Sequence, residues 1–104
     1  MKPLGYEAHI TFSRDWIQTI AVVWAVTQQG WKLSKFDADP VLGDKPYAYL
    51  THYDTDAIAL LDQMQRIANA LRETGVPVIR EKIEAIVYDT KTGVDRITVR
   101  GPVG

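Results

Sequence analysis

The hydrophobic pattern of this chain switches repeatedly between two periods, and the order of the switches restricts the folds it can adopt. Apolar and polar residues alternate in "EAHITF" (residues 7–12), as expected for a strand with one buried face. Residues 14–29 then repeat at a helical spacing before the alternation returns at 31–36. A further alternating run at 47–53 leads into a second helical pattern and a long strand-like run at 76–88. The chain therefore predicts two helices that each connect two strands and pack on a sheet.

Both predicted helices are bounded by residues that start and stop helices. Ser13 can cap the first helix and Gly30 supplies its stop. The second helix is capped by the polar residues 54–56 and ends before Gly75. The apolar residues expected in the core are Trp16, Ile17, Ile20, Ala21 and Trp24 from the first helix and Ala57, Leu60, Leu61, Met64, Ile67, Ala68 and Leu71 from the second.

The order of the elements predicts the fold class. A turn at 89–93 and a closing strand at 96–100 complete the chain. The resulting order, β-α-β-β-α-β plus one strand, resembles a ferredoxin-like α+β fold with an extra C-terminal hairpin strand. We expect a single domain over residues 1–104, in which two helices cover one face of an antiparallel sheet. In that plan we expect the first and third strands side by side and parallel in the middle, with the fourth strand on the other side of the first.

The composition argues against several kinds of partner. The 104 residues carry a formal net charge of -1, so the whole molecule has no strong attraction for nucleic acid or an anionic membrane. The absence of cysteine excludes disulfides, thiol catalysis and thiolate metal sites. Residues 1–5 contain no apolar leader, and the most apolar stretch, 17–26, is far shorter than the roughly 20 residues that span a bilayer. We therefore expect a cytoplasmic protein that has no membrane partner.

The segment "DADPVLGDK" (residues 37–45) is rich in aspartate, proline and glycine. We expect it to form a loop over one end of the sheet. Its carboxylates lack the number and spacing of the ligands in a calcium loop, and no motif places one of them beside a pair of histidines. No metal and no other cofactor are predicted.

Strand parity sorts the side chains into a helix-covered set and an open set. His9 and Thr11 share the open face of the first strand with Glu7. We expect Glu7 to pair across strands with Arg80 or Lys82. The other residues expected on the open face are Lys32, Ser34, Tyr47, Tyr49, Thr51, Tyr53, Glu84 and Tyr88, whereas Ile79, Ile83, Ala85 and Val87 are expected to face the helices.

The expected topology brings the two histidines of the chain toward one edge of the sheet. His9 and His52 each lie near the C-terminal end of a central strand and ahead of a helix N-terminus, a position that favours anions. By parity His52 points toward the helices unless its strand twists or bulges. Lys32, Arg80 and Lys82 could add charge-assisted contacts to an anion at this edge.

The run Ala8-His9-Ile10-Thr11-Phe12 resembles the hydrophobic-His-x-Thr-hydrophobic signature of the 2H phosphoesterase superfamily. Members of that superfamily process RNA ends and cyclic or 2′-5′ phosphodiester bonds without a metal ion. The resemblance implies that His9 is a catalytic acid or base and that Thr11 binds phosphate. The superfamily uses two such motifs in a longer chain, and the second candidate here, "THYDT" (residues 51–55), places its final threonine three positions after His52 instead of two.

Over most of its length the chain also resembles a small family of bacterial and phage proteins without an assigned activity. The segments that carry this resemblance are "HIT", "WKLSK", "DADPVLGD", "YAYLTHYD" and "VIREKIEAIVYDT". It implies a compact α+β fold and adds nothing about mechanism.

Two functions of the open face remain. The first is a small domain that binds an anionic, phosphate-bearing or nucleotide-like ligand, which would be a metal-independent phosphoesterase if it is an enzyme at all. The alternative is a non-catalytic module that forms a homodimer or binds a partner through the same tyrosine-rich face. Stacking of single-stranded nucleic acid is disfavoured because the RNA-recognition signature is missing. The catalytic candidates are His9 and His52, and the ligand-binding candidates are Thr11, Thr51, Lys32, Tyr49, Arg80, Lys82 and Glu84.

Overall fold

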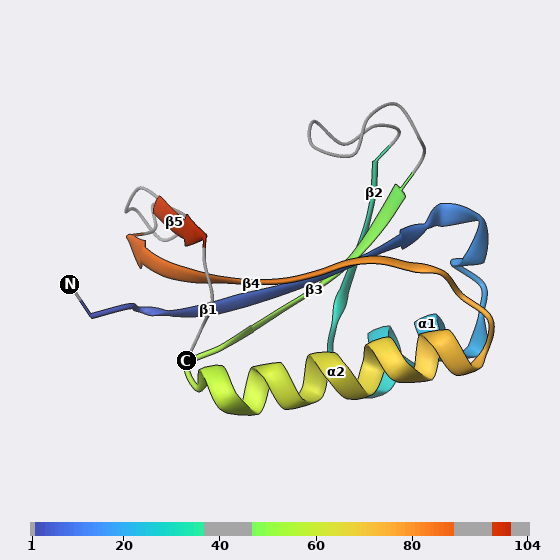
Figure 1. Ribbon diagram of the computed structural model, residues 1–104, viewed down its shortest axis with the longest axis horizontal. Helices are drawn as coiled ribbons and strands as arrows, with labels where there is room; N and C mark the ends of the chain where they lie inside the picture. Colours follow the sequence, from blue (N-terminus) through green and yellow to red (C-terminus); the bar gives the residue numbers. More distant parts are fainter. Residues whose placement is uncertain (1, 37–46, 89–96, 101–104) are drawn as a thin grey trace.

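A computed structural model describes residues 2–36, 47–88 and 97–100, which form a five-stranded sheet with two α-helices on one face (Figure 1). The strands are β1 (Gly5–Ser13), β2 (Lys32–Phe36), β3 (Tyr47–Asp54), β4 (Val78–Tyr88) and β5 (Ile97–Arg100). The helices are the 3-10 helix η1 (Arg14–Trp16) and the α-helices α1 (Ile20–Gln28) and α2 (Ala57–Glu73). Within the described ranges, no helix combines the length and apolar character needed to cross a membrane. The predicted loop at 37–45, the turn at 89–93 and the C-terminal tail at 101–104 lie outside the described residues.

The strands are ordered β2-β3-β1-β4-β5, and every neighbouring pair is antiparallel. The expected neighbours of β1 are confirmed, because β3 lies on one side of it and β4 on the other. The expected parallel direction of β1 and β3 is wrong. The connection through α1 leaves β2 running in the same direction as β1. Because β3 pairs antiparallel with β2, it is also antiparallel to β1. The C-terminal ends of β1 and β3 therefore lie at opposite ends of their pair.

Among the described residues, a hydrophobic cluster fills the space between the sheet and the helices. Ala8, Ile10 and Phe12 of β1 are completely buried in it, as their parity predicts. Helix α2 contacts β1, β3 and β4. Its predicted core residues Leu60, Met64, Ile67, Ala68 and Leu71 are buried, and Ala57 and Leu61 are partly buried.

The first helix differs from expectation in its start and in its buried face. Residues 14–16 form η1, and α1 begins only at Ile20. The buried residues of α1 are Ala21, Val22 and Ala25. Trp16, Ile20 and Trp24, which were expected in the core, are 39%, 83% and 41% exposed. When a helix is apolar on all sides, the spacing of its hydrophobic residues does not indicate which face is buried. In α1 the side that carries Ala21 and Ala25 packs inward.

An irregularity in β4 changes which of its residues face the helices. Thr11 pairs with Arg80, but the next residue, Phe12, pairs with Val78. Ile79, the residue skipped in this register, is 39% exposed instead of facing the helices as expected. A β-bulge has this effect because it inserts one extra residue into the strand, and this residue does not follow the alternation of side chains between the two faces of the sheet. Of the other residues expected to face the helices, Ile83 is buried, and Ala85 and Val87 are partly buried.

Candidate functional site

The register of the sheet aligns the open-face residues of four strands into rows that cross the sheet. The histidine row consists of Lys32, Thr51, His9 and Lys82, from β2, β3, β1 and β4 in turn. The threonine row consists of Ser34, Tyr49, Thr11 and Arg80, and the glutamate row of Tyr53, Glu7 and Glu84. Every predicted ligand-binding residue therefore lies in one of three adjacent rows centred on His9.

The imidazole of His9 is contacted at both ring nitrogens. Thr51 Oγ1 lies 3.2 Å from Nδ1, and Glu7 Oε1 lies 3.1 Å from Nε2. The His9 side chain is 19% exposed, so the ring reaches solvent while its orientation is held from both sides. A hydroxyl, an imidazole and a carboxylate in this order form the arrangement in which a histidine can move protons, because the carboxylate stabilises the imidazolium form.

Lys82 and Glu84 form an ion pair on the open face. The Lys82 ammonium lies 2.6 Å from Glu84 Oε1, and the other oxygen of Glu84 is 3.8 Å from His9 Nε2. Glu7 was expected opposite Arg80 or Lys82, but its register partner on β4 is Glu84. Like charges directly opposite each other destabilise a sheet. The cationic end of Lys82 lies where it offsets this repulsion.

His52 does not join His9. Its ring stacks on Trp31, with the ring centroids 5.3 Å apart and the planes inclined by 21°, and Trp31 is buried in the helix-side core. The parity expectation for His52 is thus confirmed. The expectation that both histidines lie toward the same C-terminal edge of two central strands is wrong, because β1 and β3 are antiparallel. His52 does precede the N-terminus of α2, whose N-cap is Asp56. The two predicted catalytic candidates lie on opposite faces of the sheet.

The remaining candidates differ in how accessible they are. Lys32 is exposed, and Arg80 and Tyr49 are partly buried. Thr11 is only 1% exposed, so its hydroxyl is not accessible from solvent in this conformation. The expectation that Thr11 binds phosphate requires an accessible hydroxyl. Tyr53 is 49% exposed, but its hydroxyl donates a hydrogen bond of 2.9 Å to the carbonyl of Leu4.

Glu7 is a site residue that is not among the catalytic or ligand-binding residues predicted from the sequence. It lies two positions before His9 on the same strand, so period-two spacing alone places both side chains on one face. Within the described parts of the chain, no group of three or more histidine, aspartate or glutamate side chains is arranged to hold a metal ion.

Comparisons with known proteins identify no relative of this chain. No protein-family model, curated protein or solved structure matches the chain.

Proposed function

We propose that the protein is a small ligand-binding domain whose open sheet face takes an anionic, phosphate-bearing ligand at the histidine row. One observation carries this proposal: His9 is held between Thr51 and Glu7, and a lysine stands at each end of the same row. Two ammonium groups and a hydroxyl can donate hydrogen bonds to phosphate oxygens. Arg80, one row away, offers a third cationic group.

The glutamate row limits the charge that such a ligand can carry. The three rows together contain three cationic side chains, Lys32, Arg80 and Lys82, and two carboxylates, Glu7 and Glu84. A polyphosphate or a nucleic acid strand would meet both carboxylates and be repelled by them. A singly charged phosphodiester that approaches from the side of Lys32 and Thr51 would avoid this repulsion. We therefore favour a small phosphodiester as the ligand.

The same geometry suits His9 for general acid-base catalysis of phosphodiester hydrolysis. A ligand that displaces the Thr51 contact would leave Nδ1 free to take the proton of an attacking water. As the new phosphorus–oxygen bond forms, the bond to the leaving oxygen breaks, and the imidazolium returns its proton to that oxygen. Glu7 at Nε2 would stabilise the imidazolium between these two steps. His9 would act without a second histidine, since His52 lies on the other face.

The ferredoxin-like plan, with β5 as the extra hairpin strand, belongs to the same proposal. The order β2-β3-β1-β4, the antiparallel pairing and the two helices on one face support it. In this plan the helices leave the opposite face of the sheet uncovered.

The alternative function, a homodimer or partner contact through the tyrosine-rich face, has less support. Tyr47 is only 6% exposed, and the hydroxyl of Tyr53 already bonds to the backbone of Leu4. The tyrosine side chains that the structure describes therefore do not form one continuous exposed surface. Interfaces are usually centred on exposed apolar and aromatic side chains.

Calorimetric titration with adenosine 2′,3′-cyclic phosphate and with inorganic phosphate tests the binding proposal. We expect the wild-type protein to bind, and Lys32→Met and Lys82→Met each to weaken binding about tenfold or more, which corresponds to ~1.4 kcal/mol. Arg66→Met is the matched control, because Arg66 is an exposed α2 cation paired with Asp62. Raising the salt concentration should weaken binding further. Wild-type protein that binds neither probe, or lysine variants that bind like the control, would contradict the proposal.

Turnover is tested separately with the cyclic substrate. His9→Gln should retain binding but lose hydrolysis, because the amide cannot cycle a proton. Hydrolysis at the wild-type rate in this variant would remove His9 from the chemistry and leave the binding proposal intact.

A further inference from the structure

Glu84 is the one charged side chain that is buried among the residues that the structure describes. Its Oε1 atom lies 2.6 Å from the Lys82 ammonium, and its Oε2 atom lies 3.8 Å from His9 Nε2. A carboxylate in a buried position needs a charged or hydrogen-bonding partner, and Lys82 supplies one. The negative charge of Glu84 therefore stands between the proposed ligand-binding lysine and the proposed catalytic imidazole.

This ion pair makes the two ends of the histidine row unlike each other. Lys82 is partly buried and contacts the carboxylate, so an anion at that end meets an ion pair and not a single cation. Lys32, at the other end of the row, is exposed. Glu7 stands directly opposite Glu84, and both carboxylates lie at the Nε2 side of His9. A ligand at the Nδ1 side of the ring therefore has an exposed lysine on one flank and two carboxylates beyond the ring.

We propose that Glu84 makes the histidine row select a phosphodiester, which carries one negative charge, over a phosphomonoester, which carries about two near pH 8. The inference rests on the proposed binding of a phosphate-bearing ligand and assigns the selectivity of that binding to one residue. Because the Glu84 carboxylate cancels most of the field of the Lys82 ammonium, Lys82 offers the ligand hydrogen-bond donors but little net charge. A second charge on the phosphate gains little from this ion pair and is repelled by Glu7.

Hydrolysis gives this selectivity a second consequence. When water attacks a phosphodiester, a new phosphorus–oxygen bond forms, one ester bond breaks, and the alcohol leaves with a proton. The phosphomonoester that remains has one more acidic oxygen, whose proton dissociates to solvent with a pKa of about 6. Near pH 8 the product therefore carries more negative charge than the substrate. The charge of Glu84 that excludes a phosphomonoester as a ligand would also favour release of the phosphomonoester as a product.

Three other charged residues near the site are less suited to this role. Glu7 lies 3.1 Å from His9 Nε2 and takes part in the proposed chemistry, so its charge affects turnover as well as binding. Arg80 lies one row away from His9. Arg100 stands opposite Glu84 in register, but on β5, which is one strand farther from the ligand than β4 and is therefore screened more strongly by salt. Glu84 combines burial with an ion pair to a lysine of the row.

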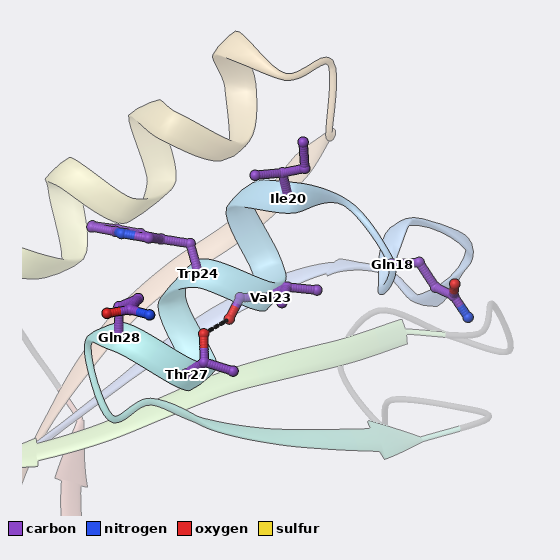
Figure 2. A pocket seen from close by; sticks show the side chains of 6 residues that line it. All are labelled: Gln18, Ile20, Val23, Trp24, Thr27 and Gln28. Carbon is purple, nitrogen blue, oxygen red and sulfur yellow. Dashed lines mark hydrogen bonds between the residues drawn. The ribbon is translucent and has the colours of Figure 1, made fainter.

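The shallow depression beside α1, on the helical side of the sheet, does not compete for a phosphate ester (Figure 2). It has a volume of about 260 Å³. Its lining residues all have uncharged side chains: Gln18, Ile20, Val23, Trp24, Thr27 and Gln28. The Thr27 hydroxyl already donates a 2.7 Å hydrogen bond to the Val23 carbonyl, as Figure 2 shows. A phosphate ester therefore gains no charge-assisted contact from these side chains.

Calorimetric titration at about pH 8 tests the inference with two ligands that share a nucleoside. Adenosine 2′,3′-cyclic phosphate carries one charge, and adenosine 3′-phosphate carries about two. We expect the wild-type protein to bind the cyclic ester about tenfold or more tightly than the 3′-phosphate. Glu84→Gln should bind the 3′-phosphate more tightly than the wild type does, a gain that loss of the fold cannot produce, and its preference should fall to about threefold or less. Glu81→Gln is the matched control, since Glu81 lies on the same strand but pairs with Arg72 of α2, and it should keep the wild-type preference.

The methyl ester of adenosine 3′-phosphate separates charge from shape without any substitution at Glu84. It carries one charge and has the open shape of the 3′-phosphate, so we expect it to bind like the cyclic ester. Repeating the titrations in the His9→Gln background keeps both diesters intact and should give the same preferences.

The outcomes separate this inference from the proposed function. Equal binding of the cyclic ester and the 3′-phosphate by the wild type would overturn the selectivity and leave anion binding intact, whereas binding of neither would overturn both. A Glu84→Gln variant with the wild-type preference would show that the charge of Glu84 is not the cause. A methyl ester that binds as weakly as the 3′-phosphate would overturn the inference in favour of selection by shape.

Discussion

His9 and Thr51 lie directly opposite each other on β1 and β3, with Thr51 Oγ1 3.2 Å from His9 Nδ1. The two residues are 42 positions apart, so this contact exists only because the sheet pairs their strands. The contact helps to orient the ring so that Nε2 points toward Glu7. Each side of the imidazole can therefore be tested by a substitution that leaves the hydrophobic core untouched.

Thr51→Val should remove the hydroxyl contact and keep the shape of the side chain. We expect the free energy of unfolding to fall by about 1 kcal/mol, as for the loss of one typical hydrogen bond, and binding of the cyclic phosphodiester to weaken. Urea denaturation and calorimetry measure the two effects. Thr51→Ser retains the hydroxyl and should behave nearly like the wild type. A valine variant indistinguishable from the serine variant would show that the hydroxyl does not hold the ring.

His52→Ala should have a structural effect only. The His52 ring stacks on the buried Trp31, and loss of this contact should lower the free energy of unfolding by about 1–2 kcal/mol. Anion binding should be unchanged, because His52 lies on the helix-covered face. Thermal melting and phosphodiester titration of the same sample check both statements. A folded variant that no longer binds the probe would instead give His52 a part in the site.

Gly5→Ala should destabilise the first strand through a steric clash. A Cβ atom at Gly5 would overlap the ring of Tyr53, whose hydroxyl bonds to Leu4. Displacing this ring should cost about 1–3 kcal/mol. In a Tyr53→Ala background the same change should cost much less, because no ring remains to be displaced. Equal effects of Gly5→Ala in the two backgrounds, measured by urea denaturation, would show that the clash is not the cause.

Asp56→Ala should destabilise α2 more than Thr19→Ala destabilises α1. Asp56 Oδ1 accepts hydrogen bonds from the backbone of Ile58 at 3.0 Å and of Ala59 at 3.1 Å. Thr19 is the N-cap of α1 but makes no capping bond with its side chain. Loss of a working cap costs about 1 kcal/mol. Similar shifts in Tm for the two variants would contradict this difference.

The second helix was predicted well because several signals agree. Its capping aspartate, its apolar stripe and the terminal Gly75 all mark the same segment, and Gly75 has the positive φ that ends a helix. The first helix was predicted poorly because its segment is apolar on every side. Periodicity favoured Ile20, Ala21 and Trp24 as core residues, but packing buried only Ala21 of these three, together with Val22 and Ala25.

The sequence predicted on which face of the sheet the two histidines lie, but not the contacts they make. Parity places His9 on the open face and His52 on the covered face, because successive side chains of a strand alternate. The cross-strand partners of these residues depend on the register between neighbouring strands, which places Glu7 opposite Glu84 and not opposite a lysine. The β-bulge moves Ile79 out of the alternation of inward and outward side chains along β4. The mixed apolar and charged residues of this strand do not mark the position of the bulge in the sequence.

The sequence by itself determined the number and order of the main elements, the capping of α2 and the face on which the side chains of β1 lie. These properties depend on neighbours along the chain, and local steric rules set them. Only the tertiary structure decided the direction of β3 against β1, the contacts around His9 and the side of α1 that stays exposed. Those depend on pairing between distant segments, where many registers and packings satisfy the same local pattern.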